Sequence, residues 1–227
     1  MDEKSFDKFA EEYDEILAQS LHTNEAGTRY FAKHKVALMA KCLKGRTVVR
    51  VLDFGCGPGR SLPLLRRCFP GAEVCGFDPS EPCVVEARAR CPEARVFGSL
   101  DDPGLMEGGG FDGILMSNVL HHIVPAARAE TMRRCAAILA PGGSVFIVEH
   151  NPRNPVTRRV FERCPFDVGA VMLPRQELLG LGRAAGLKTA ASGYTLFFPP
   201  SLGFLRGLEW MLTWLPLGAQ QFARFER

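Results

Sequence analysis

A buried strand that turns through three glycines into a helix is the feature that most constrains this chain. Residues 51–60 read VLDFGCGPGR, in which an apolar run is followed by glycines at alternate positions, Gly55, Gly57 and Gly59. Glycine lets a backbone turn sharply and lets a ligand lie against it without a clashing Cβ atom. The helix expected next, over 61–68, directs its free N–H groups to the same place, which suits a carboxylate or a phosphate. The segment predicts a ligand-binding turn in an α/β fold.

Strand and helix patterns alternate along the middle of the chain, which predicts βαβ units and a parallel sheet. The expected strands cover 47–53, 72–77, 95–97, 111–116 and 144–148, and further helices cover 81–90 and 125–139. Two helices are expected before this core, over 5–19 and 24–43. A loop over 150–155, a helix over 174–185, strands over 187–198 and 218–225 and an apolar helical stripe over 204–215 are expected after it.

The composition fits one α/β domain, because 227 residues that are 46% hydrophobic can bury a sizeable core. The net charge of +3 gives no case for nucleic acid by itself. Residues 150–227 carry ten Lys or Arg and five Asp or Glu, so positive charge is concentrated there. The charged N-terminus lacks the apolar run of a signal peptide, and no long uncharged apolar run occurs. We therefore expect a cytoplasmic protein.

The eight cysteines form no CxxC pair and no cluster with histidine in the sequence. Neither a disulfide framework nor a metal site is expected from such a pattern, which fits a reducing compartment. Cys75 and Cys135 fall in apolar patterns, where a free thiol packs like a small hydrophobic residue.

An acidic residue at the end of the second expected strand adds to the glycine loop. Asp78 can accept hydrogen bonds from both ribose hydroxyls of a nucleoside, a placement that serves NAD and S-adenosylmethionine alike. The loop discriminates between them, because a dinucleotide fingerprint needs glycine where this chain has Arg60. The GxGxG spacing led by Asp53 instead resembles motif I of Rossmann-like methyltransferases.

The resemblance to class I S-adenosylmethionine-dependent methyltransferases covers residues 48–150. Residues 111–123 (FDGILMSNVLHHI) resemble motif IV of the ubiquinone- and menaquinone-type small-molecule enzymes, and 138–148 (ILAPGGSVFIV) resembles the helix–turn–strand after it. The resemblance implies a Rossmann-like, doubly wound α/β sheet of seven strands in the order 3-2-1-4-5-7-6, with strand 7 antiparallel. The chain would be a single domain with a helical cap (1–46), a cofactor-binding core (47–150) and an acceptor-pocket region (151–227). An apolar helical insertion would lie between strands 6 and 7.

The resemblance also implies which residues bind the cofactor, S-adenosyl-L-methionine. Gly55 and Gly57, with Cys56 between them, would line its methionine part, and Asp53 would face the amino group. Asp78 would bind the ribose. The other implied contacts are Pro79, Ser99 and Leu100 at the adenine, Asn118 and Val119 under the methionine, and Tyr13, which would close over the cofactor.

Three histidines follow the fourth and fifth strands, on the edge where doubly wound sheets bind ligands. Methyl transfer depends mainly on alignment, but a hydroxyl nucleophile also needs a base near neutral pH. His121, His122 and His150 are therefore candidate bases. The alternative is that they pack in the core or shape a loop, and Glu149 can equally be a buried carboxylate bonded to backbone N–H groups.

Two features of the C-terminal third leave alternatives open. The first is a cluster of four arginines, Arg153, Arg158, Arg159 and Arg163. This cluster is either a solvated face or a site that recognises an anionic acceptor through guanidinium groups. The second is the apolar stripe over 204–215, for which burial in the core is the first expectation. Residues 202–215 could instead cover a substrate, contact a second copy or lie on a membrane surface as a peripheral anchor.

The sequence therefore predicts an enzyme that moves a methyl group to an oxygen, nitrogen or carbon of a small-molecule acceptor, anionic or lipid-like. One alternative is an NAD(P)-binding oxidoreductase, against which Arg60 and the lack of a Tyr-x-x-x-Lys pair argue. Another is a non-catalytic methyltransferase-like binding subunit, which Ser99 suggests because the family often has aspartate there. No nucleic-acid acceptor is expected, because residues 117–120 (SNVL) lack the tetrapeptide of base N-methylating enzymes.

Overall fold

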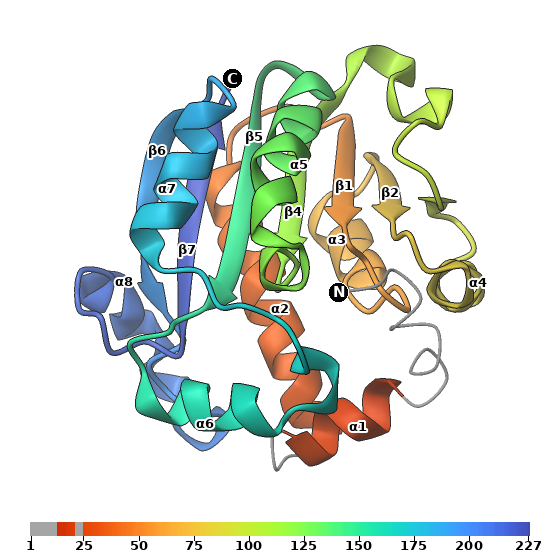
Figure 1. Ribbon diagram of the computed structural model, residues 1–227. Helices are drawn as coiled ribbons and strands as arrows, with labels where there is room; N and C mark the ends of the chain where they lie inside the picture. Colours follow the sequence, from red (N-terminus) through yellow and green to blue (C-terminus); the bar gives the residue numbers. More distant parts are fainter. Residues whose placement is uncertain (1–12, 21–24) are drawn as a thin grey trace.

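One sheet of seven strands forms the centre of the described part of the chain (Figure 1). The structure is a computed structural model that describes residues 13–20 and 25–227. The strands lie in the order β3-β2-β1-β4-β5-β7-β6, with β7 antiparallel to β5 and β6, which confirms the predicted sheet. They are β1 (Arg50–Phe54), β2 (Glu73–Phe77), β3 (Arg95–Phe97), β4 (Phe111–Ser117), β5 (Leu139–His150), β6 (Lys188–Thr195) and β7 (Gln220–Glu226).

The helices agree with the predicted ranges up to the end of the fifth strand. They are α1 (Tyr13–Ser20), α2 (Glu25–Cys42), α3 (Leu62–Cys68), α4 (Glu81–Arg90) and α5 (Pro125–Ala137), followed by α6 (Pro155–Arg163), α7 (Arg175–Ala184) and α8 (Glu209–Leu212). Three 3-10 helices border the site, η5 (Leu120–His122), η6 (Pro165–Asp167) and η7 (Pro200–Leu208). The first part of the helix predicted over 5–19 lies outside the described residues. None of the helices described is both long and apolar enough to cross a membrane.

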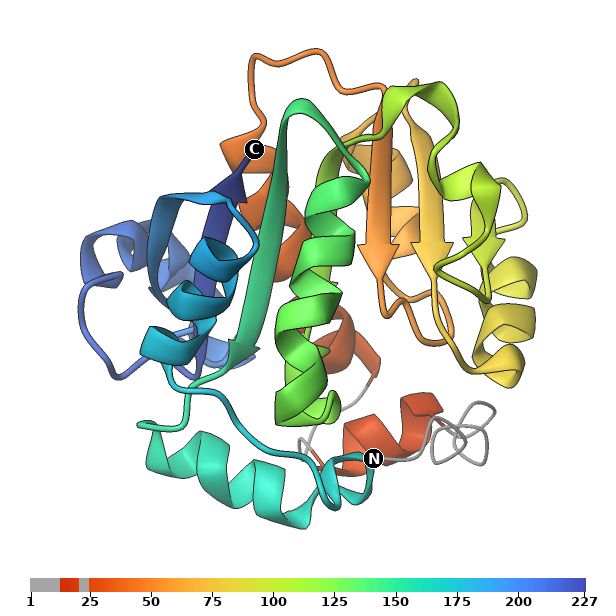
Figure 2. The same cartoon turned by 45° about the horizontal axis from the view of Figure 1, so that its top comes forward.

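Each face of the sheet carries its own core, because successive strand residues point to opposite sides. Leu52 and Phe54 of β1 pack in one cluster with Cys135 of α5. Val51 packs in the other cluster with Met39 of α2. Figure 2 shows α5 and α7 in front of the sheet and α2 behind it. With both faces covered, the ends of the strands are left to form the site.

The segment after β5 contains a helix that the sequence patterns did not predict. The loop expected over 150–155 ends at Asn154, whose Oδ1 accepts a hydrogen bond from the Thr157 N–H at 2.9 Å and so caps α6. Pro155 occupies the first turn, where its missing N–H costs no helical hydrogen bond. The predicted arginine cluster therefore lies on and beside a helix.

The apolar stripe predicted over 204–215 is neither one helix nor core. The chain there forms η7 and then the single turn of α8, and Phe204 and Trp214 are exposed. Gly203 and Gly207 interrupt the segment, because glycine disfavours a continuous helix. The position of this insertion between β6 and β7 is as predicted.

Candidate functional site

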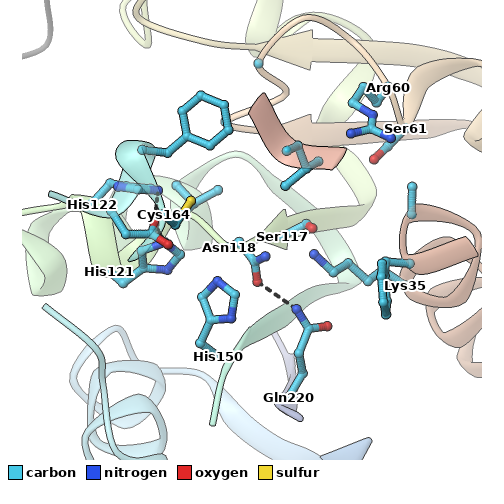
Figure 3. A pocket seen from close by; sticks show the side chains of 18 of the residues that line it. Lys35, Arg60, Ser61, Ser117, Asn118, His121, His122, His150, Cys164 and Gln220 are labelled. Carbon is cyan, nitrogen blue, oxygen red and sulfur yellow. Dashed lines mark hydrogen bonds and ion pairs between the residues drawn. The ribbon is translucent and has the colours of Figure 1, made fainter. Parts of the chain in front are cut away.

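A pocket of about 990 Å³ opens at the carboxyl ends of β1, β2, β4 and β5 (Figure 3). It is lined by twelve of the fourteen predicted site residues: Asp53, Gly55, Cys56, Gly57, Asp78, Pro79, Leu100, Asn118, Val119, His121, His122 and His150. Ser99 is not among the lining residues; it is exposed, and its hydroxyl accepts a hydrogen bond from the Asp101 N–H at 3.2 Å. Tyr13 begins α1, but its side chain lies outside what the structure describes.

The glycine loop packs tightly against the protein on one side and leaves space in the pocket on the other. The N–H groups of Gly55 and Cys56 donate to the Phe77 carbonyl at 2.7 and 2.9 Å. Gly55 has a φ of +71°, and a Cβ there would lie 2.6 Å from Cγ2 of Val119, so a larger residue does not fit. A Cβ at Gly57 would meet no atom within 4 Å. The loop therefore leaves room for a ligand against its backbone.

Asp78 connects this loop to the end of β2. Its Oδ2 accepts a hydrogen bond from the Gly57 N–H at 2.8 Å, and its Oδ1 accepts one from the Ser80 N–H at 3.0 Å. Each carboxylate oxygen has a second lone pair, so the group can also accept hydrogen bonds from ligand hydroxyls. Asp78 can thus position the loop and bind a ribose with the same carboxylate.

Two buried groups of opposite charge line the pocket beside the loop. Asp53 is 2% exposed, and Lys35 of α2 is 8% exposed. Burial raises the pKa of Asp53 to about 7, although the Lys35 cation opposes the shift. Burial lowers the pKa of Lys35 to about 8, against the attraction of Glu149 and Asp53. A ligand with both a carboxylate and an ammonium group would find a partner for each here.

Asn118 lies between β4 and the start of β7. It has a φ of +57°, in the left-handed region that asparagine tolerates better than most residues. Its N–H donates to the Val148 carbonyl at 2.8 Å, and its Oδ1 accepts a hydrogen bond from Nε2 of Gln220 at 3.1 Å. Gln220 is directly opposite His150 in the pairing of β7 with β5. The antiparallel strand therefore contributes to the pocket wall.

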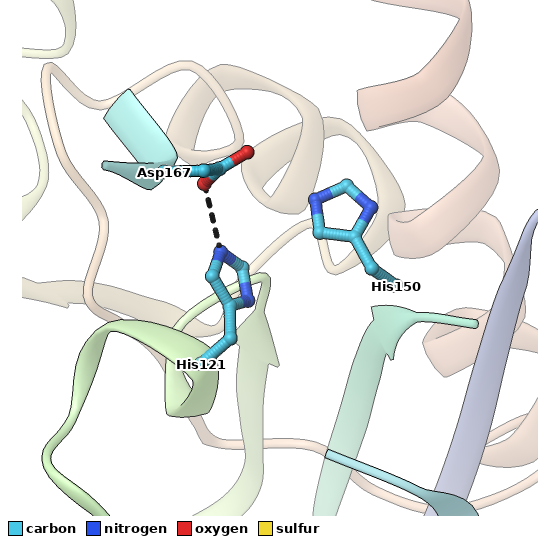
Figure 4. Close-up of side chains that lie close together, drawn as sticks. All are labelled: His121, His150 and Asp167. Carbon is cyan, nitrogen blue, oxygen red and sulfur yellow. Dashed lines mark ion pairs between the residues drawn. The ribbon is translucent and has the colours of Figure 1, made fainter. Parts of the chain in front are cut away.

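A buried histidine between two carboxylates organises the other half of the pocket, and Figure 4 shows one of these carboxylates, Asp167, beside His121. Nδ1 of His121 lies 2.6 Å from Oε2 of Glu149, and its Nε2 lies 3.3 Å from Oδ1 of Asp167. Burial opposes a charged ring, but the two carboxylates outweigh it and raise the pKa of His121 to about 9. The Glu149 carboxylate also accepts hydrogen bonds from the N–H groups of Val119 and Leu120 at 2.9 and 2.7 Å. His121 is thus an imidazolium at neutral pH, held by charges of opposite sign.

The other two histidines are neutral at the same pH. Burial, together with the His121 cation, lowers the pKa of His122 to about 3 and that of His150 to about 4. The ring of His150 lies 5.0 Å from that of His121, between centroids, and Figure 3 shows it in the pocket beside Asn118. A neutral imidazole keeps a free lone pair, so it can accept a proton.

His121, His150 and Asp167 also place three metal-binding atoms within 4.8 Å of one another. Coordination would need a lone pair on a ring nitrogen of His121. Both nitrogens face carboxylates and carry protons when the ring is charged. In this state the ring offers no lone pair to a metal ion, so the arrangement favours an ion-paired cluster over a metal centre.

Three residues that build the site carry no local sequence signal: Lys35, Asp167 and Gln220. A single lysine on a helix usually faces solvent, and an aspartate outside any motif usually does too. Each of these side chains reaches the pocket from an element that is distant in the sequence from the glycine loop.

Known proteins share both the sequence family and the fold. A family model described as a methyltransferase domain matches residues 12–192. A trans-aconitate 2-methyltransferase of Variovorax paradoxus is 31% identical over 71% of this chain and 66% of its own length. A ubiquinone biosynthesis O-methyltransferase of Xanthomonas campestris pv. campestris is 35% identical over 43% of this chain and 41% of its own length. The chain thus spans slightly less than two thirds of the first relative and about two fifths of the second.

A solved structure supports the same assignment at the level of the fold. The SAM-dependent methyltransferase from Archaeoglobus fulgidus superimposes with a TM-score of 0.69 at 16% identity and covers 93% of this chain and 98% of its own. The predicted order of the motifs, the observed order of the strands and the family match agree. The chain belongs to the methyltransferase domain family, and within it to the class I, Rossmann-like S-adenosylmethionine-dependent methyltransferases.

Proposed function

We propose that this protein transfers a methyl group from S-adenosyl-L-methionine to an oxygen atom of a small-molecule acceptor, with His150 as the general base. The observation that carries the proposal is a neutral imidazole in the pocket wall, backed by a charged histidine that is itself paired with two carboxylates. His121 is occupied by its two ion pairs, and His122 lies 3.5 Å from Asp167 through its Nε2. His150 is therefore the best placed of the three candidate bases.

The residues beside the glycine loop fit the cofactor. Asp53 would face its ammonium group, Lys35 its carboxylate, and Asp78 its ribose hydroxyls. The open face of Gly57 would accommodate its methionine part, and Pro79 and Leu100 line the pocket where the adenine would lie. When bound, S-adenosyl-L-methionine supplies an electrophilic methyl group on a sulfonium.

The acceptor would enter on the side of the pocket formed by α6, η6 and residues 196–199. Asn118 and the loop behind it fix one wall, so a bound hydroxyl can be aligned with little loss of freedom during the reaction. His150 would take the hydroxyl proton as the new oxygen–carbon bond forms and the carbon–sulfur bond to the methyl group breaks, which leaves S-adenosylhomocysteine. Burial and the His121 cation keep the His150 ring neutral before the reaction, and the Asp167 and Glu149 carboxylates would partly offset both when the ring takes up the proton.

The relatives support oxygen as the acceptor atom. One is named for a tricarboxylic acid, trans-aconitate, and the other for O-methylation in ubiquinone biosynthesis. The oxidoreductase alternative gains no support from the family match. A non-catalytic binding subunit would not need a neutral histidine in the acceptor half of the pocket.

The test is methyl transfer from S-adenosyl-L-methionine labelled in its methyl group to a panel of carboxylate- and phenol-bearing acceptors. The proposal expects transfer by the parent protein to a hydroxyl acceptor, with a large loss in His150→Asn and a small one in His122→Asn. A carboxylate acceptor is already ionised at neutral pH and needs no base, so its methylation should not depend on His150. Binding of S-adenosylhomocysteine, measured by calorimetry, should survive in both variants. Tight binding without transfer to any member of the panel would favour the non-catalytic subunit, and equal losses in both variants would remove His150 as the base.

A further inference from the structure

The insertion between β6 and β7 carries its apolar side chains outward. We call the outer apolar patch the six exposed side chains Phe204, Leu208, Trp210, Met211, Trp214 and Leu217. Phe204 is 80% exposed and Trp214 is 72% exposed. These are large apolar groups within one short stretch of chain, and contiguous apolar exposure of this kind marks interaction surfaces.

The two charged residues of the same insertion, Glu209 and Arg206, contact the rest of the protein. Glu209 is buried, and its Oε2 accepts hydrogen bonds from the Thr195 hydroxyl and the Leu196 N–H, both at 3.1 Å. The guanidinium of Arg206 lies 4.6 Å from the centre of the Tyr30 ring. A surface helix of a globular protein normally shows the opposite arrangement, with its apolar face inward. The buried polar contacts thus hold the outer apolar patch in a fixed, outward orientation.

A basic helix is tied to this insertion. The Nδ2 of Asn154 donates to the Leu217 carbonyl at 2.7 Å, and the hydroxyl of Thr157 donates to the Ala219 carbonyl at 2.9 Å. Figure 1 shows α8 at the left of the molecule and α6 below it. The arginines in and just before α6, Arg153, Arg158, Arg159 and Arg163, are all exposed. The only ion pair found for these four in the described structure joins Arg158 to Glu162 at 4.0 Å, between two exposed side chains.

We propose that the outer apolar patch and the α6 arginines dock the protein onto a lipid bilayer that contains anionic phospholipids. Tryptophan is favoured at the boundary between lipid and water, and both tryptophans of this chain belong to the patch. Arginines beside an apolar insertion are attracted to anionic head groups. A second copy fits less well, because a two-fold interface over the patch would bring two sets of arginines together.

The docking surface is continuous with the pocket. Val156 of α6 is 69% exposed, Leu217 of the outer apolar patch is 58% exposed, and both also line the pocket. A protein docked in this way would hold the rim of its pocket at the lipid–water boundary. If the proposed methyl transfer holds, this position favours an amphiphilic acceptor drawn from the bilayer.

The experiment is a titration of the full chain with phosphatidylcholine vesicles, with and without phosphatidylglycerol, followed by intrinsic tryptophan fluorescence and co-sedimentation. Trp210 and Trp214 are the only tryptophans, so the emission reports on the patch alone. The proposal expects a blue shift and co-sedimentation with the anionic vesicles, and a marked weakening of both at high salt. No acceptor or cofactor is needed, so a negative result here is distinct from a failure of methyl transfer.

Matched variants test whether vesicle binding depends on the outer apolar patch and the α6 arginines, or on exposed apolar and basic residues anywhere on the surface. Met211→Ser and Phe204→Ser keep both tryptophans and should weaken vesicle binding, whereas Met106→Ser, at 57% exposure against 54% for Met211, should not. The double variant Arg158→Gln, Arg159→Gln should weaken binding by roughly fivefold per charge. The corresponding double variant Arg66→Gln, Arg67→Gln on α3 should leave binding unchanged.

Three outcomes would overturn the proposal. The first is no blue shift and no co-sedimentation with anionic vesicles. The second is equal weakening by the patch variants and their matched controls. The third is a dimer in sedimentation velocity that Phe204→Ser converts to monomer while vesicles do not compete for it, since the patch would then be covered by a second copy.

Discussion

The two halves of the pocket are built in different ways. The cofactor half comes from short stretches of chain, the glycine loop and the turn after β2, joined by backbone hydrogen bonds such as that from Gly55 N–H to Phe77. The acceptor half brings together His121, His150 and Asp167 from three separate elements, and β7 adds a residue from near the end of the chain. The first half is lined by backbone, two carboxylates and Lys35, and the second by histidines and Asp167.

This difference implies that a substitution in one half of the pocket can impair that half without affecting the other. A change in the cofactor half should alter affinity for the cofactor, because in the proposed function its groups contact that molecule directly. A change in the acceptor half should alter turnover or stability, because its charges are balanced within a buried cluster. Each of the following predictions tests that separation.

The largest expected effect is on turnover in His150→Asn. Loss of a general base lowers the rate by about 10²–10⁴-fold, and the variant should leave affinity for S-adenosylhomocysteine unchanged. Steady-state kinetics with an active acceptor, combined with calorimetry, would measure both quantities. A parallel fall in cofactor affinity would show that the two halves are coupled.

The next effect is on stability in Glu149→Gln. Removing one partner of a buried ion pair costs about 3–5 kcal/mol in free energy of unfolding. The pKa of His121 is raised from 6.5 to about 9, so its pairing stabilises the fold fully below pH 6.5 and is lost as the pH rises toward 9. The pKa of Glu149 is lowered from 4.5 to about 2, so its pairing stabilises above pH 4.5 and is lost as the pH falls.

Parent and variant should therefore differ most between pH 4.5 and 6.5 and converge above pH 9. Denaturant unfolding across this range would provide the measurement. A difference that stays constant with pH would mean that His121 is not charged in the folded protein.

A smaller effect is expected in the cofactor half. Asp78→Ala should weaken binding of S-adenosylhomocysteine at least tenfold, or about 1.4 kcal/mol, because the variant loses both the ribose acceptor and the bond to the Gly57 N–H. Asp101→Ala, at an exposed position, serves as the control. Calorimetric titration measures the change, and unaltered affinity in Asp78→Ala would contradict the assigned ribose contact.

The smallest expected effect is that of removing metal ions. Because both ring nitrogens of the charged His121 carry protons and cannot bind a metal ion, treatment with EDTA should leave turnover and unfolding free energy unchanged. Loss of activity that returns on addition of Zn²⁺ would instead make His121, His150 and Asp167 a metal site.

The sequence predicted the sheet order correctly, and most of the residues that it assigned to the cofactor line one pocket. Strand and helix periods are local, and a glycine loop between a buried strand and a helix depends on residues a few positions apart. It was less informative after His150, where α6 was not predicted and the apolar stripe was assigned to the core. Apolar spacing alone cannot distinguish an inward face from an outward one. Within the stripe the buried side chain is Glu209, whereas the apolar side chains next to it are exposed.

The sequence by itself thus determined the family and the cofactor loop, because their signals lie in local spacing and in the order of motifs. Only the tertiary structure decided the surroundings of the histidines. The pKa of each depends on which carboxylates and cations surround it after folding, and Asp167 reaches His121 from a different element. The same applies to Lys35 and Gln220, which reach the pocket only once α2 and β7 have packed in place.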